Sequence, residues 1–247
     1  MGMQRYKCKI AYVGTGYSGY QVQPNGRTIQ SEIEFALAKL HKGVPIRISS
    51  SGRTDAGVHA KGQVIHFDSE LSIPESKWTV ALNSLLPEDI AVLEVECVSA
   101  DFHSRYDAIG KEYRYFLLQS AIRDPFMRNY AYQFPYDLNF SDMETAAKLL
   151  IGTHNFTSFC SAKTEVIDRV RTLQEIEIFR ENGLIVFRFI GNGFLYNMVR
   201  ILVGTLLEVG TGKRDPRSIP AVLASEDRAA AGKTAPPQGL YLWSVFY

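Results

Sequence analysis

Cysteine and long apolar runs are both scarce in this chain, and each scarcity excludes a class of protein. The three cysteines, Cys8, Cys97 and Cys160, lie far apart and form no CxxC pair, which argues against a disulfide framework and against a cysteine zinc site. No apolar run reaches the roughly 18 residues that a membrane-spanning helix requires. The first ten residues also lack the apolar stretch of a secretory signal. We therefore expect a cytoplasmic protein that makes no membrane contact.

Net charge is almost absent, but the charges are unevenly distributed. The chain has 27 basic and 26 acidic side chains. Residues 1–54 carry a balance of +6, and residues 55–101 carry a balance of −7. Such a distribution presents a basic face to an anion, unless folding brings the two regions together and cancels the dipole. The sequence leaves both alternatives open.

The overall composition is that of a globular protein. With 247 residues, 46% of them apolar and 21% charged, the chain is long enough for one large domain or two packed halves. Apolar periodicity and turn residues predict two similar series of strands and helices. Strands are expected at 8–13, 46–50, 63–68, 91–98, 113–118, 170–180, 184–190 and 240–246, and helices at 28–41, 78–86, 141–151 and 195–209.

These elements predict an α+β fold made of two similar halves. The halves are expected at residues 1–104 and 105–247, each with an antiparallel or mixed sheet and helices on one face, like a duplicated RNA-recognition domain. Thr28 is expected to cap the first helix, because threonine is a favoured residue immediately before a helix.

Two segments imitate nucleotide-binding loops. Residues 14–19, GTGYSG, fit the GxGxxG pattern of a dinucleotide oxidoreductase, but that site needs a helix to begin at once. Pro24 and Asn25-Gly26 mark further turns before the helix at residue 28, so we interpret the segment as a loop. Gly232-Lys233-Thr234 resembles the end of a phosphate-binding loop, but Asp227 stands where a glycine is required. Five scattered histidines predict no metal site.

Three segments combine charged and aromatic residues in ways that suggest chemistry. The loop 51–60 places Asp55 between Arg53 and His59, although a glycine-rich turn explains it equally well. Arg200 is the only basic residue of an apolar helix, so its guanidinium either reaches solvent or meets a carboxylate or phosphate. The segment 110–116 alternates tyrosines, including Tyr113, with basic residues, which fits either core packing or stacking on nucleic-acid bases.

Several motifs together resemble the bacterial tRNA pseudouridine synthase A family. They are AYVGTGYSGYQVQ, GRTDAGVHA, KEYRYF, GTHNFTSF, GNGFLYNMVR and TAPPQGLYLWSVFY, and they extend from about Tyr6 to Tyr247. The resemblance implies an isomerase that converts uridine to pseudouridine at positions 38, 39 and 40 of the tRNA anticodon arm. It also implies a homodimer without a cofactor, and two α+β halves whose sheets meet at a basic active-site cleft.

The resemblance also implies a role for four residues. Asp55 matches the catalytic aspartate of the family, and Tyr113 matches the tyrosine that stacks on the target uracil. Arg200 matches the arginine that pairs with the aspartate, and Arg53 matches an arginine that helps to hold the flipped nucleotide. Without the resemblance, the residues equally allow a tRNA-binding or chaperone module that does no chemistry. Asp55 separates the two hypotheses, because pure binding has little use for a carboxylate that faces phosphates.

Overall fold

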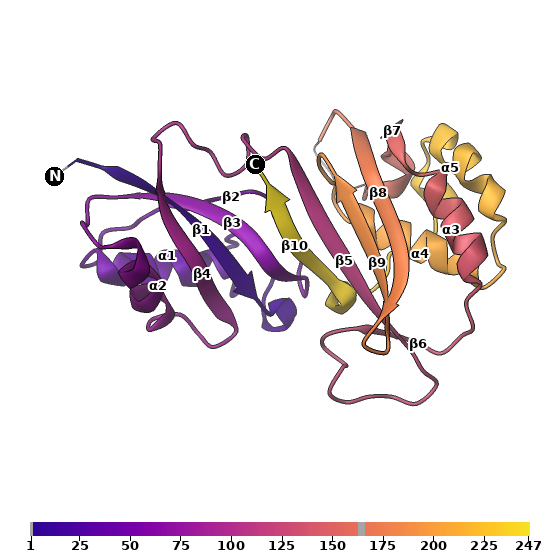
Figure 1. Cartoon of the computed structure of the whole chain (residues 1–247), viewed down its shortest axis with the longest axis horizontal. Coiled ribbons are helices and arrows are strands. Elements are labelled where there is room, and N and C mark those ends of the chain that lie inside the picture. The colour runs from indigo at the N-terminus through magenta and orange to yellow at the C-terminus, as the bar shows by residue number, and fades with distance from the viewer. Residues whose placement is uncertain (1, 163–165) are drawn as a thin grey trace. The chain divides into compact units, whose positions relative to one another are not determined.

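The structure is a computed structural model that describes residues 2–162 and 166–247. Its Cα positions form two compact units, one of Met1–Ile109 with Tyr241–Tyr247 and the other of Gly110–Leu240 (Figure 1). Strands and helices occur together in both units, which confirms the predicted α+β class. No helix within the described ranges is long and apolar enough to cross a membrane.

The first unit is a mixed sheet in the order β4-β1-β3-β10, with β2 paired to β3. β1 is antiparallel to both β3 and β4, whereas β10 is parallel to the beginning of β3. The first unit thus takes its last strand from the C-terminal end of the chain, which a division at residue 104 does not anticipate. The strands are β1 (Gln4–Tyr12), β2 (Ser49–Ser50), β3 (His59–Ser69), β4 (Ile90–Val98) and β10 (Leu240–Phe246).

The first unit also contains two helices, α1 (Ile29–Leu40) and α2 (Glu75–Asn83), which contact each other. Thr28 is the N-cap of α1, as predicted, and its side chain and that of Ser31 each accept a hydrogen bond from the other residue's backbone N–H. Trp78 of α2 is fully buried and contacts the rings of Tyr6 and Phe67, so aromatic packing joins the helix to the sheet.

The second unit contains strands in the order β5-β9-β8-β7, all antiparallel, with the short β6 parallel to β5. Helices α3, α4 and α5 gather beside these strands, and the β5–β6 connection projects as a broad loop (Figure 1). The elements are β5 (Gly110–Gln119), β6 (Tyr132–Phe134), β7 (Gly152–Asn155), β8 (Val170–Glu181), β9 (Leu184–Gly191), α3 (Phe140–Lys148), α4 (Met198–Gly210) and α5 (Ile219–Ser225).

Several boundaries differ from the sequence prediction. The strand expected at 46–50 is reduced to β2, and β3 begins at His59 instead of residue 63. His59 and Ala60 pair with β10, a partner some 180 residues away that no local pattern reveals. The helix expected from residue 195 begins only at Met198, because Asn197 adopts a left-handed conformation with φ of 61°. The elements β6, β7 and α5 were not predicted.

Candidate active site

The loop 51–58 connects β2 to β3, and buried polar groups fix its first residues. The Ser51 N–H donates to the Val64 carbonyl at 2.8 Å. The Ser51 hydroxyl donates to the side-chain oxygen of Gln63 at 2.6 Å, and the Gln63 amide donates to the Gly52 carbonyl at 2.7 Å. Since Ser51 and Gln63 are both completely buried, breaking this set would leave polar groups without partners inside the protein.

The middle of the loop is held by the segment that follows β1. The Tyr20 N–H donates to the Thr54 carbonyl at 3.0 Å. The buried hydroxyls of Tyr12 and Thr54 share a hydrogen bond of 2.8 Å. Thr54 is therefore fixed through both its backbone and its side chain, one residue before Asp55.

Two of the three glycines in the GTGYSG segment, Gly14 and Gly19, are required by this contact. A Cβ at Gly14 would lie 1.9 Å from the Val58 carbonyl oxygen, and one at Gly19 would lie 3.1 Å from the Thr54 carbonyl oxygen. Gly19 also has a φ of +100°, which side chains rarely adopt. The two glycines thus allow one loop to approach the backbone of the other, and the interpretation of GTGYSG as a loop is confirmed.

Asp55 begins the tight turn in which the loop ends. Its carbonyl accepts a hydrogen bond of 3.1 Å from the Val58 N–H, and Gly57 at the third position has a φ of +78°, as a type II turn requires. The Asp55 residue is half-buried. His59, after the turn, is completely buried: its Nδ1 accepts from the Gly14 N–H at 3.1 Å and its ring stacks on Tyr241. Its position is that of a core residue, and Asp55 is the acid that this loop presents.

Tyr113 lies in β5 and is 8% exposed. Its ring meets the Phe194 ring edge to face at a centroid distance of 4.9 Å. The neighbouring Tyr115 is fully buried and donates to the Pro236 carbonyl, while Arg114 pairs with Glu112 at 2.6 Å. Most side chains of the segment 110–116 therefore pack in the core or pair with a neighbour, which is the first of the two alternatives that the sequence left open.

Arg200 lies in the first turn of α4, a helix that is otherwise almost entirely buried. Its Nε donates to the Ala235 carbonyl at 2.7 Å and its Nη1 donates to the side-chain oxygen of Asn197 at 2.8 Å. The Ala235 N–H donates back to the Arg200 carbonyl at 3.0 Å. These bonds hold the guanidinium against the protein, so Arg200 does not simply extend into solvent.

Residues 232–234, which resemble the end of a phosphate-binding loop, pack along α4. A Cβ at Gly204 would lie 1.7 Å from the Lys233 carbonyl oxygen, and the Gly232 N–H donates to the Thr205 hydroxyl at 2.9 Å. These residues therefore position the helix that carries Arg200. Within the described residues there is no group of three or more His, Cys, Asp or Glu side chains that could hold a metal ion.

The opposite charges of residues 1–54 and 55–101 meet across the strands of the first unit. Four ion pairs connect the two regions, because β1 lies between β3 and β4. They are Arg5–Asp68, Lys7–Glu96, Lys9–Glu94 and Arg27–Asp89. Much of the dipole that the sequence suggested is thus cancelled, and any attraction for an anion must come from the cations that remain unpaired.

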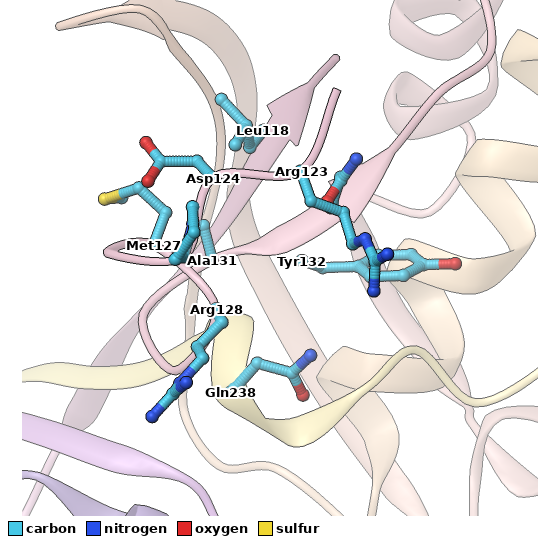
Figure 2. Close-up of a pocket in the computed structure, with 10 residues that line it drawn as sticks. Leu118, Arg123, Asp124, Met127, Arg128, Ala131, Tyr132 and Gln238 are labelled. Carbon is cyan, nitrogen blue, oxygen red and sulfur yellow. The ribbon is translucent and has the colours of Figure 1, made fainter. Parts of the chain in front are cut away.

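Two unpaired arginines line the wider pocket of the second unit. Arg123 and Arg128 come from the β5–β6 loop, and neither forms an ion pair with a carboxylate within the described part of the chain. Figure 2 shows Arg123 with Tyr132 on one side of the view, and Arg128 with Gln238 on another, around a cavity of about 490 Å³. None of the four predicted site residues lines this cavity.

His66 of β3 connects the sheet of the first unit to the turn 103–107. Its Nδ1 accepts from the Ser104 N–H at 3.2 Å, and the Ser104 hydroxyl reaches the Ser49 carbonyl at 3.0 Å. A ring nitrogen that accepts a hydrogen bond carries no proton, so this arrangement requires neutral His66. Burial, assisted by the positive charge of Arg5, lowers the pKa of His66 to about 4.

Comparison with known proteins shows similarity along the whole chain. A family model described as tRNA pseudouridine synthase matches residues 9–107 and 146–247, which include Arg53, Asp55 and Arg200 but not Tyr113. A protein of Bacillus cereus named tRNA pseudouridine synthase A 1 is 58% identical over 245 residues, covering 99% of each chain. Proteins named tRNA pseudouridine synthase A are 56% identical in Geobacillus kaustophilus, covering 99% of this chain and 95% of the relative, and 57% identical in Listeria monocytogenes, covering 99% and 100%.

The lowered pKa of His66 predicts a loss of stability in acid. Because the folded pKa of about 4 lies below the ordinary value of 6.5, the neutral histidine stabilises the fold fully above pH 6.5. As the pH falls from 6.5 towards 4, the unfolded chain takes up a proton that the folded chain does not, so the free energy of unfolding decreases. Urea denaturation at pH 7, 6, 5 and 4.5 measures this decrease.

The variant His66→Asn should show a weaker pH dependence than the wild type over the same interval, even if it is less stable at every pH. His154→Asn, in the second unit, serves as the matched control. An equal pH dependence in the wild type and in His66→Asn would contradict the assignment.

Proposed function

Because the chain belongs to the tRNA pseudouridine synthase family, we propose that it isomerises uridines 38, 39 and 40 of the tRNA anticodon arm with Asp55 as the nucleophile. The enzyme is an isomerase that makes pseudouridine in tRNA. The observation that supports Asp55 is the loop 51–58, in which hydrogen bonds hold Ser51, Thr54 and Val58 around an aspartate that is only half-buried. Reactive side chains are commonly presented on loops that a rigid scaffold positions.

The reaction needs a nucleophile and an enclosure, and it needs no oxidant or external group. The N1–C1′ bond of uridine breaks and a C5–C1′ bond forms, while C5 loses a proton and N1 gains one. A carboxylate either attacks carbon or stabilises the positive charge that develops at C1′. Attack at C1′, attack at C6 and a route through a glycal all satisfy this balance. Since the target base is stacked in the arm, it must first leave the stack.

Tyr113 is proposed to stack on the flipped uracil. Phe194 supports its ring from the side, so the tyrosine holds a defined orientation. Arg200 is proposed to pair with Asp55, because a guanidinium beside a carboxylate favours the charged form that nucleophilic attack requires. Its bonds to Ala235 and Asn197 orient the guanidinium plane before any such pairing. Arg53 is proposed to help hold the flipped nucleotide.

The resemblance implies three further properties, which we include in the proposal. The protein forms a homodimer, it acts in the cytoplasm, and the two α+β halves of each chain form a basic cleft. The alternative is a module that binds tRNA without chemistry. It predicts that Asp55 contributes to the loop alone, so that its charge is dispensable.

Replacement of Asp55 by asparagine should abolish pseudouridine formation, with a fall in turnover of at least about 10³-fold. Asparagine has almost the same shape and tolerates the turn, but it lacks the negative charge. The affinity for tRNA should remain close to wild type, because no contact with phosphate is removed. Pseudouridine is measured by mass spectrometry of the digested tRNA, and affinity by filter binding.

Asp137→Asn provides the matched control, because this aspartate is exposed in the second unit. It should retain wild-type activity. Substantial activity in purified Asp55→Asn would contradict the nucleophile assignment, and an equal loss of activity and binding would favour the binding module.

The variant Tyr113→Phe should bind tRNA nearly as tightly as the wild type and should lose more in turnover than in affinity. The ring is retained and still stacks, whereas the hydroxyl that moves a proton is lost. Single-turnover rates at saturating enzyme separate the two effects. An unchanged rate would restrict Tyr113 to stacking.

A further inference from the structure

A small polar pocket adjoins the catalytic loop within the first unit. Its volume is about 240 Å³, below the 300–1,000 Å³ that is typical of sites for free small molecules. It therefore suits one unit of a longer ligand. The lining residues include Tyr20, Gln30, Ser50, Arg53, Arg105 and Tyr106.

Neither arginine of this pocket pairs with a carboxylate among the residues that the structure describes. The other three arginines of the first unit, Arg5, Arg27 and Arg47, each form an ion pair with an acidic side chain. In contrast, Arg53 and Arg105 are exposed, and their side chains form no hydrogen bond or ion pair with any residue in the described ranges. Two unpaired guanidinium groups at one small pocket attract an anion, and their planar donors match the oxygens of a phosphate.

The turn that carries Arg105 is rigid. The His103 Nδ1 accepts from the backbone N–H groups of Arg105 and Tyr106 at 3.1 and 3.3 Å. The His103 backbone N–H donates to the Asp107 carboxylate at 2.8 Å. Ser104 is held by hydrogen bonds from its N–H to His66 Nδ1 and from its hydroxyl to the Ser49 carbonyl. The backbone from which the Arg105 side chain extends is therefore held in place, which reduces the ordering that binding a ligand requires.

Tyr106 adds a flat aromatic surface beside the cations. It is 78% exposed, and its ring lies 4.2 Å from the ring of His103. A large aromatic side chain gains nothing from such exposure in the free protein, whereas it stacks readily on a nucleic-acid base. Tyr20 lines the same pocket with a 2% exposed side chain; its hydroxyl, near Ser50, has no hydrogen-bond partner within 3.5 Å in the described structure.

We propose that this pocket binds a nucleotide of the tRNA that neighbours the target uridine, with Arg105 and Arg53 contacting its phosphate and Tyr106 stacking on its base. The inference rests on the proposed function, since it assumes that the target uridine lies at Asp55. Arg53 is only two residues from Asp55, so their Cα atoms lie at most about 7 Å apart. The pocket thus lies within reach of the next nucleotide along the strand.

The test compares tRNA binding by Arg105→Ala, Arg105→Lys and Tyr106→Ala across a range of salt concentrations. Arg105→Ala should weaken binding about tenfold and reduce the slope of log Kd against log salt by about one, because one phosphate contact is lost. Arg105→Lys keeps the charge, so it should restore the slope while recovering only part of the affinity. Tyr106→Ala should weaken binding about tenfold without changing the slope.

Arg217→Ala is the matched control, because this arginine is exposed, lies in the second unit and lines none of the pockets described above. Its affinity and slope should equal those of the wild type. Turnover at saturating tRNA should also equal that of the wild type in Arg217→Ala, whereas the loss in Tyr106→Ala should be larger in KM than in kcat. Because Arg105 and Tyr106 are exposed, the urea midpoints of all variants should match that of the wild type.

Phosphate ethylation interference locates the contact. Ethylation of a phosphate within two nucleotides of the target uridine should weaken binding by the wild type and by Arg217→Ala, and it should weaken binding by Arg105→Ala clearly less, because that variant keeps only Arg53 at this phosphate. If Arg105→Ala has wild-type affinity and slope, or loses interference only at a distant phosphate, the inference is wrong. If the wild type binds tRNA through this pocket but forms no pseudouridine, the proposed function fails and the binding site stands.

Discussion

The close approach of the loop after β1 to the loop between β2 and β3 is the contact on which the site depends. Gly14 and Gly19 allow two backbones to meet where any side chain would separate them. Tyr12 and Tyr20 then fix Thr54 through its hydroxyl and its carbonyl, directly before Asp55. The same loop is closed on its other side by the pairing of β10 with the start of β3. The backbone at Asp55 is thus held by residues from near both ends of the chain.

The sequence allowed the α+β class and the long elements to be predicted, because periodicity and capping are local properties. The cap at Thr28 and the strands β8 and β9 are examples. The roles of residues 14–19 and 232–234, which resemble nucleotide-binding loops, could be predicted only in part. Their failure as nucleotide sites was visible in Pro24 and Asp227, but their partners, Val58 and Thr205, are contacts of the folded chain.

Arg105 and Tyr106 could not be predicted as site residues from the sequence for a similar reason. They fall at the junction of the two predicted halves, where the pattern indicates neither strand nor helix. A signal was present, since histidine, arginine and tyrosine occur together in FHSRYD. Only the fold shows that His66 and Ser49 hold this turn, and that the turn lines one pocket with the loop 51–58. Arg5, Arg27 and Arg47 each pair with an acidic side chain, so Arg53 and Arg105 are the two arginines of the first unit that form no ion pair with a described residue.

We propose that the residues of this chain alone make pseudouridine in the anticodon arm of tRNA. The most direct measurement incubates an unmodified tRNA transcript, carrying uridines inside and outside the arm, with the purified protein, and maps pseudouridine with a base-specific chemical probe. The account predicts modification of the uridines at positions 38, 39 and 40 and of no others. Pseudouridine at other positions only, or none at any position, would contradict it.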